Sequence, residues 1–168
     1  MEGIKDLAFC GEIVLQVKIA RRAAERLEAT KDNFDYIEVW CSIQSILVAA
    51  GNVSKILSPP DKKYKLRGER LKQMLNVEID NVLLNRKFRN NFFEHYDSRI
   101  DEWFSNRPTG VYIDLAINPS FNGRNLNNHR GYNSFNNTLE FRGEILDLDA
   151  ILIAMEKIFE NCKPYTLA

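Results

Sequence analysis

The segment from Arg89 to His95 gathers three side chains that can act together on a phosphodiester. Histidine exchanges a proton near neutral pH, so His95 is a candidate general base for a ribose 2′-hydroxyl or general acid for the leaving 5′-oxygen. Arginine stays charged and offers a planar fork of donors, so Arg89 is a candidate to hold the phosphate and stabilise the transition state. Asn90 is a candidate to position either of these side chains or the phosphate. The combination predicts metal-independent RNA cleavage without a cofactor, and DNA is excluded because the reaction needs the 2′-hydroxyl.

The helical periodicity around this segment puts Arg89 in an unusual place. At about 100° per residue, five apolar side chains form one stripe, with Arg89 inside it and His95 at its edge; the five are Phe88, Phe92, Tyr96, Ile100 and Trp103. A guanidinium on the core-facing side of a helix must be paired or must line a cleft, because an unpaired buried charge is very costly. The pattern therefore favours a cleft that holds Arg89.

The run Arg89-Asn90-x-x-x-x-His95 resembles the signature of the HEPN superfamily, the higher eukaryotes and prokaryotes nucleotide-binding domains. In that family an arginine is followed by a polar residue and, a few residues later, by a histidine on a late helix of a bundle. The resemblance implies a metal-independent endoribonuclease, often a toxin or antiviral defence factor, whose two motifs face each other across a homodimer interface. It also implies catalytic roles for Arg89, Asn90 and His95 and, for a toxin, an antitoxin protein as partner.

The same residues also allow other interpretations. Arg89 can be an arginine at the edge of the core, paired with a carboxylate such as Glu38. His95 can be a histidine on the helix surface, bonded to Asn91 or to a group near Arg99. The chain would then be a non-catalytic HEPN-like module that binds a nucleotide or a partner, or a purely structural helical protein. His129, the only other histidine, lies beside Arg130 in an Asn-rich stretch and is expected to be an exposed loop residue.

Basic residues concentrate between Lys62 and Arg89, although the formal net charge of the 168-residue chain is zero. A neutral total argues against coating nucleic acid by bulk electrostatics. If the local basic stretch serves RNA, the residues expected near phosphates are Lys62, Lys63, Lys65 and Arg67. An exposed, solvated face is an equally good interpretation of the stretch taken alone.

Composition indicates a soluble domain that needs no disulfide or metal to fold. Hydrophobic residues make up 45% of the chain, and the three cysteines are widely spaced and form no C-x-x-C pair. Charged residues within the first twenty positions interrupt any apolar run that would act as a signal peptide or membrane span. We therefore expect a cytoplasmic protein that does not contact membranes.

The periodicity of apolar residues predicts one mainly α-helical domain over residues 1–168, an up-and-down bundle of four or five helices. Asp32 or Asn33 is expected to cap the second helix, the pair Pro59-Pro60 to stop it, and Asp147 or Asp149 to cap the last. The expected helices are Ile4 to about Glu28, the second as far as Leu57, Arg67 to Leu75, Asp80 to Phe104, and Ala150 to Asn161.

A β-hairpin is expected to be inserted between the last two helices, at about 110–146. Apolar residues alternate from Val111 to Ile117 at the period of a half-buried strand, and a second strand is expected from about Asn137 to Leu146. The asparagine-rich stretch between them is expected to be a loop or a contact surface.

Overall fold

The computed structural model describes residues 2–85, 96–106, 112–119, 129–141 and 144–166. The chain divides into two compact units. Unit 1 comprises Met1–Glu94 together with Ile151–Ala168, and unit 2 comprises His95–Ala150. The architecture is mainly helical with a small inserted β-sheet, which confirms the expected fold class.

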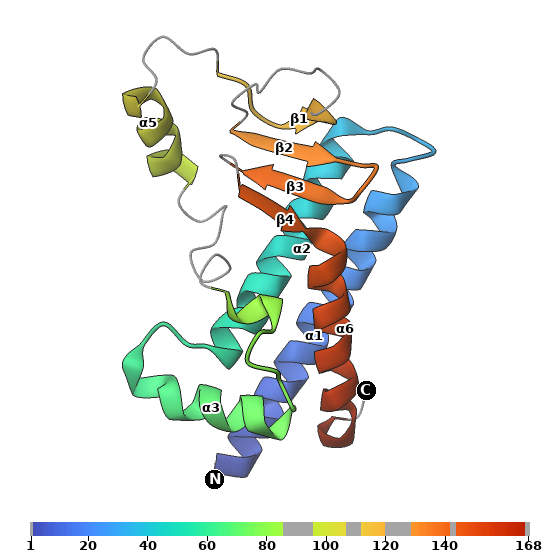
Figure 1. Ribbon diagram of the computed structural model, residues 1–168. Coiled ribbons are helices and arrows are strands. Elements are labelled where there is room, and N and C mark those ends of the chain that lie inside the picture. Colours follow the sequence, from blue (N-terminus) through green and yellow to red (C-terminus); the bar gives the residue numbers. More distant parts are fainter. Residues whose placement is uncertain (1, 86–95, 107–111, 120–128, 142–143, 167–168) are drawn as a thin grey trace. The chain divides into compact units, whose positions relative to one another are not determined.

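Two long antiparallel helices form the centre of unit 1 (Figure 1). The first, α1 (Glu2–Ala29), follows the predicted span, and the second, α2, covers Tyr36–Leu57. Each places a stripe of aliphatic side chains at helical spacing against the other, and these side chains are shielded from water; they include Ile13, Val17, Ile43, Ile46, Leu47 and Val53. Burial of this stripe is the main force that holds the helices together.

Local signals define the ends of α2. Its N-cap is Asp35, whose Oδ1 accepts the backbone N–H groups of Ile37 and Glu38 at 2.9 and 3.1 Å. The expectation of Asp32 or Asn33 as the cap is wrong, because only Asp35 stands directly before the first helical residue. Pro59-Pro60 ends the helix as predicted, since proline removes a donor and restricts the residue before it.

Among the described residues, α2 is the one helix that is long and apolar enough to cross a membrane. Its most apolar 18-residue window is 61% buried inside the fold. That burial is typical of the core helix of a globular protein.

A short 3-10 turn, η1 (Lys62–Tyr64), leads directly into α3 (Lys65–Met74), close to the predicted short helix. Gly68 lets α3 approach the carboxyl end of α2: a Cβ at this position would lie 2.6 Å from Pro59 Cδ and 2.7 Å from Leu57 O. Leu71 and Leu75 are fully buried, and the side-chain amide of Asn161 donates to the carbonyl of Leu75 at 2.7 Å.

The prediction of one continuous helix from Asp80 is wrong. Val82–Leu84 forms a 3-10 turn, η2, and Asn85 after it has an extended backbone with ψ 137°. The side chain of Asn81 accepts the Leu83 N–H at 3.0 Å, and Leu83 is fully buried. This local hydrogen bond favours a tight turn over helix propagation. The next described helix is α5, Tyr96–Asn106, in unit 2.

The last long helix, α6 (Leu148–Cys162), packs antiparallel to α1, with Met155 and Ile158 in the core. An exposed bidentate ion pair joins the two helices, with Arg21 Nε and Nη2 lying 3.0 and 2.8 Å from the carboxylate oxygens of Glu156. Asp147 accepts the Ala150 N–H at 2.9 Å, so one of the two expected caps is confirmed.

Unit 2 contains α5 and a four-stranded sheet of order β1-β2-β3-β4. Strand β1 pairs parallel with β2, whereas β2, β3 and β4 pair antiparallel. The expected second strand is divided into β3 and β4, and β2 lies in the stretch expected to be a loop. The strands are β1 (Ala116–Ile117), β2 (Arg130–Asn133), β3 (Thr138–Phe141) and β4 (Glu144–Asp147).

The strongest predicted strand, Val111 to Ile117, is shortened to two residues. Leu115 has a left-handed backbone with φ 54°, which interrupts the extended conformation. The carboxylate Oδ1 of Asp114 accepts the Leu115 N–H at 2.9 Å and supports this turn. Alternation of apolar residues therefore identified a β segment but not the break inside it.

Candidate functional site

The predicted catalytic residues Arg89, Asn90 and His95 lie outside the described residues. The structure describes the chain as far as Asn85 and again from Tyr96. The last described element before the motif is η2 in unit 1, whose Leu83 side chain is buried. The first described element after the motif is α5, which begins at Tyr96.

The carboxylate considered as an alternative partner of Arg89 is engaged by its own neighbours. Glu38 Oε1 lies 3.1 Å from Arg26 Nε and accepts the Ser42 hydroxyl at 2.8 Å. These contacts connect α1 and the first turns of α2. Glu38 thus has a role within unit 1 that does not need Arg89.

Three of the four residues expected near phosphates are exposed. Lys62 and Lys63 lie on η1 and Lys65 begins α3, next to Tyr64 in the sequence. Lys63 Nζ is 3.2 Å from Asp61 Oδ2 and 4.7 Å from the centroid of the Tyr64 ring. Tyr64 itself is 40% exposed. The segment presents positive charge and an aromatic ring at one surface.

Arg67, the fourth of these residues, points instead into the junction between α2 and α3. Its Nη2 donates to the carbonyl oxygens of Lys55 and Ile56 at 3.3 and 3.4 Å, at the end of α2 where backbone acceptors lack helical partners. Its guanidinium carbon lies 4.5 Å from the centroid of the Phe9 ring and 5.3 Å from that of Tyr64. Arg67 therefore joins α1, α2 and η1.

An ion pair between Arg70 and Asp6 fixes α3 to α1. The Arg70 guanidinium donates two hydrogen bonds to the Asp6 carboxylate, with Nε–Oδ2 and Nη2–Oδ1 distances of 2.7 and 2.9 Å. These hydrogen bonds, opposed by burial of the carboxyl, hold the pKa of Asp6 below its ordinary value. Together, Arg67 and Arg70 orient α3 and the lysines that precede it.

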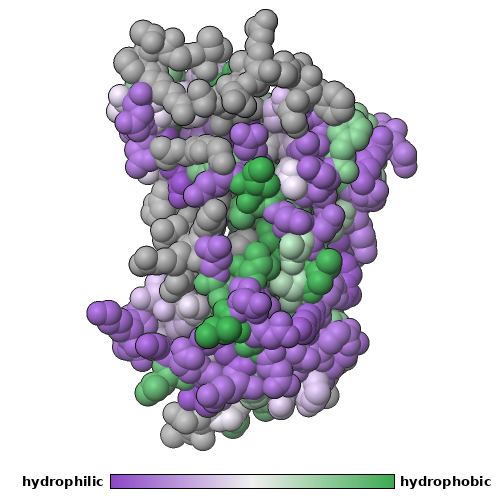
Figure 2. Space-filling model, in the orientation of Figure 1, coloured by the Kyte–Doolittle hydropathy of each residue, from purple (hydrophilic) through white to green (hydrophobic). Residues whose placement is uncertain are grey.

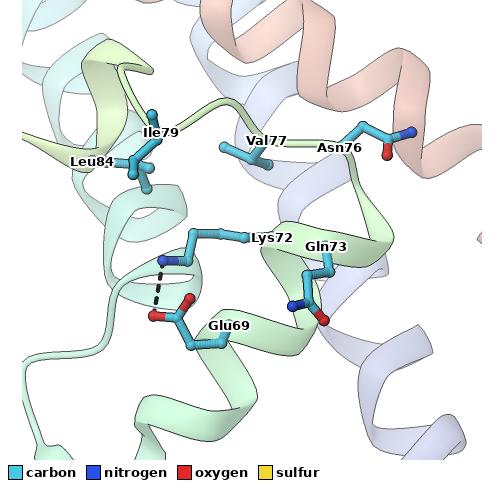
Figure 3. A pocket seen from close by; sticks show the side chains of 7 residues that line it. All are labelled: Glu69, Lys72, Gln73, Asn76, Val77, Ile79 and Leu84. Carbon is cyan, nitrogen blue, oxygen red and sulfur yellow. Dashed lines mark hydrogen bonds and ion pairs between the residues drawn. The ribbon is translucent and has the colours of Figure 1, made fainter.

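A pocket of about 450 Å³ lies on the other side of α3, between this helix and the connection that leads to η2 (Figure 3). Lys72 extends across it and bonds Glu69 at 3.0 Å. Val77, Ile79 and Leu84 supply its apolar wall. The pocket combines one ion pair with an apolar surface, and it lies on the segment that runs toward Arg89.

The expectation that His129 is an exposed loop residue is wrong, because its side chain is fully buried in unit 2. Its ring stacks on Trp103 with centroids 5.5 Å apart and planes 11° apart, and its Nδ1 lies 3.0 Å from the Tyr112 hydroxyl oxygen. Phe141 from β3 adds a third aromatic contact at 5.3 Å. His129 is thus a core histidine.

Beside His129, Asp114 and Arg130 form a bidentate ion pair that the sequence interpretation missed. The Nε–Oδ1 and Nη2–Oδ2 distances are 2.9 and 2.7 Å, and the Arg130 and Asp114 side chains are only 9% and 13% exposed. The Tyr112 hydroxyl also donates to Asp114, at 3.3 Å. A carboxylate within an apolar alternation was the available signal, since such a residue needs a partner when it is buried.

The two buried cysteines have thiols of low reactivity. Burial raises the pKa of Cys162 to about 12 and also raises that of Cys10, while Cys41 is exposed. Since the thiolate is the reactive form, Cys10 and Cys162 are poorly suited to nucleophilic chemistry.

Comparison of the chain with protein-family models, with curated proteins and with solved structures gives no match.

Proposed function

We propose that this chain is a metal-independent endoribonuclease of the HEPN type that cleaves single-stranded RNA. The observation that carries the proposal is the sequence Arg89-Asn90-x-x-x-x-His95, which unites a permanent cation, a polar positioning group and a proton-transfer group. The mainly helical fold is compatible with such a domain, and the exposed Lys62, Lys63 and Lys65 supply positive charge for a polyanionic substrate.

In the proposed reaction the ribose 2′-oxygen attacks the adjacent phosphorus while the bond from phosphorus to the 5′-oxygen breaks. One histidine accepts the 2′-hydroxyl proton, and a second protonates the leaving 5′-oxygen. The products are a 2′,3′-cyclic phosphate and a 5′-hydroxyl. Arg89 neutralises the extra charge on the phosphoryl oxygens, and Asn90 positions the phosphate. Because each chain carries one such motif, a separate base and acid require His95 from two chains. A homodimer is therefore part of the proposal.

We further propose that the protein acts in the cytoplasm as a toxin or defence factor and that an antitoxin protein regulates it. Controlled expression in a bacterial host tests this role. Growth should stop with the wild-type chain and continue with His95→Ala at an equal protein level. Equal growth of the two cultures would remove the toxin role without affecting the cleavage proposal.

The decisive experiment incubates the purified wild type, Arg89→Ala and His95→Ala with mixed cellular RNA in EDTA. Arg22→Ala, which removes an exposed arginine of α1, is the matched control. We expect the wild type and Arg22→Ala to cut, both motif variants to lose activity by at least about a hundredfold, and a 2′-deoxy substitution at the cut site to block cleavage.

Circular dichroism and light scattering would establish that the variants keep their fold and oligomeric state. Absence of cleavage by the wild type across a broad RNA panel would overturn the proposal. Nucleotide binding without turnover would then identify the chain as a non-catalytic binding module.

A further inference from the structure

The surface formed by η1 and the start of α3 combines an aromatic ring with three exposed lysines in four consecutive residues, Lys62 to Lys65. The visible surface over α3 is predominantly hydrophilic (Figure 2). Two large side chains are exposed in these surroundings, Tyr64 at 40% and Leu66 at 80%, and of the two only Tyr64 carries an aromatic ring. Unpaired bases stack on exposed aromatic rings, and lysines bind the phosphates between them.

The ring of Tyr64 is held in place from within the fold. Arg67 lies between Tyr64 and Phe9, with its guanidinium carbon 5.3 and 4.5 Å from the two ring centroids. Its hydrogen bonds to the Lys55 and Ile56 carbonyls fix the guanidinium against α2. An aromatic side chain held in this way loses little conformational entropy when a base stacks on it.

Lys63 Nζ lies over the Tyr64 ring, 4.7 Å from its centroid, so this lysine must move aside for a base to stack there. Its one acidic partner in the segment binds it only weakly. Asp61 is the one acidic residue in the segment from Asp61 to Arg67, and its Oδ1 already caps the turn by accepting the Lys63 N–H at 2.9 Å. Its Oδ2 contacts Lys63 at 3.2 Å, in a pair whose side chains are 48% and 64% exposed. An exposed pair of this kind is weak, so a phosphate can compete for Lys63.

We infer that Tyr64 is a base-stacking residue for single-stranded RNA, that Lys62, Lys63 and Lys65 bind the flanking phosphates, and that Arg67 is a positioning residue. This inference rests on the proposed function and deepens it. It assigns Arg67 a role different from the phosphate contact expected from sequence. It also separates two contributions, since stacking depends weakly on salt whereas phosphate binding depends strongly on it.

The test uses the full chain carrying His95→Ala, so that the probe is not cut, and a fluorescent 15-nucleotide oligouridine. Anisotropy titrations at several salt concentrations would compare Tyr64→Phe, Tyr64→Leu and the triple variant Lys62→Ala/Lys63→Ala/Lys65→Ala. The matched charge control is Lys5→Ala/Lys18→Ala/Arg22→Ala, which removes three exposed cations from α1.

We expect Tyr64→Leu to weaken binding by about tenfold with an unchanged salt slope, and Tyr64→Phe to bind as the parent does, because a phenyl ring also stacks. The triple lysine variant should reduce the slope of log K against log salt by about 2, since each phosphate contact on a single strand contributes about 0.7. The charge control should keep most of the slope.

Equal binding by Tyr64→Leu and the parent would overturn the inference. If heparin and anionic vesicles bind the parent as tightly as the oligonucleotide, and lose binding only with the lysines, the surface is a general anion site and the inference also fails. The proposed function is tested separately by cleavage: an active wild type with no effect of Tyr64→Leu refutes only the inference, whereas Tyr64-dependent binding without cleavage refutes only the catalysis.

Discussion

The carboxylate of Asp6 couples the stability of unit 1 to pH through its two hydrogen bonds with Arg70. Because its pKa is lowered in the folded state, the ionised form stabilises the fold at neutral pH. This contribution is lost as the pH falls below about 4, the ordinary aspartate value, and through the lower folded value. We expect Asp6→Asn to reduce the free energy of unfolding by about 1–2 kcal/mol at pH 7.

Urea unfolding of Asp6→Asn and the wild type at a series of pH values between neutral and strongly acidic would check this prediction. The difference between the two proteins should shrink on acidification. A difference that stays constant down to the lowest pH would show that the interaction does not depend on the charge of Asp6.

Two bidentate arginine–carboxylate pairs differ mainly in exposure and so predict different energies. Asp114 and Arg130 are 13% and 9% exposed, whereas Arg21 and Glu156 are each 43% exposed. Removing one partner of a buried pair costs about 3–5 kcal/mol, whereas an exposed pair contributes about 1 kcal/mol or less. Asp114→Ala should therefore lower the melting temperature far more than Glu156→Ala. Equal effects in thermal unfolding followed by circular dichroism would contradict this assignment.

Packing of the helices gives opposite predictions for two glycines. A methyl group at Gly68 would clash with Pro59 Cδ and Leu57 O, whereas one at Gly11 on α1 would meet no atom within 4 Å. Both positions are helical, where alanine is intrinsically better than glycine by about 1 kcal/mol. Gly11→Ala should therefore stabilise the protein by about 0.5–1 kcal/mol, and Gly68→Ala should destabilise it by about 1–3 kcal/mol. Chemical denaturation of the two variants measures both signs.

The elements also show what the sequence can predict. Helix α1 and the end of α2 followed from apolar spacing and from Pro59-Pro60, which are local signals. The burial of His129 depends on partners that the fold brings together, Trp103 and Tyr112. The turn at Leu115 is local, supported by the carboxylate of the neighbouring Asp114, but the alternation of apolar residues does not reveal it. The type of a polar residue in a strand or loop does not predict which distant side chains it will contact.

The basic stretch from Lys62 to Arg67 also shows which features of the candidate site the sequence can predict. Lys62, Lys63 and Lys65 are exposed, as a basic, polar stretch predicts, but Arg67, two residues after Lys65, contacts α2 carbonyls and aromatic rings. Residue type alone cannot separate these roles. Arg89, Asn90 and His95 lie outside the described residues, so their grouping remains a prediction.

At the scale of the whole molecule, the proposed chemistry predicts self-association. If two His95 residues act as base and acid across an interface, the active species is a dimer. Light scattering after gel filtration should give twice the chain mass, and specific activity should fall on dilution below the dissociation constant. Full activity in a strictly monomeric state would contradict the two-motif arrangement.

The division of the chain has a consequence for the order in which the protein is assembled. Unit 1 is discontinuous: its helices α1 to α3 precede unit 2, and most of α6 follows it. During translation α1 and α2 can pair early, but the core residues Met155 and Ile158 arrive only after all of unit 2 has been synthesised. Until then an apolar surface of α1 lacks α6, and the nascent chain exposes it to chaperones or to premature association.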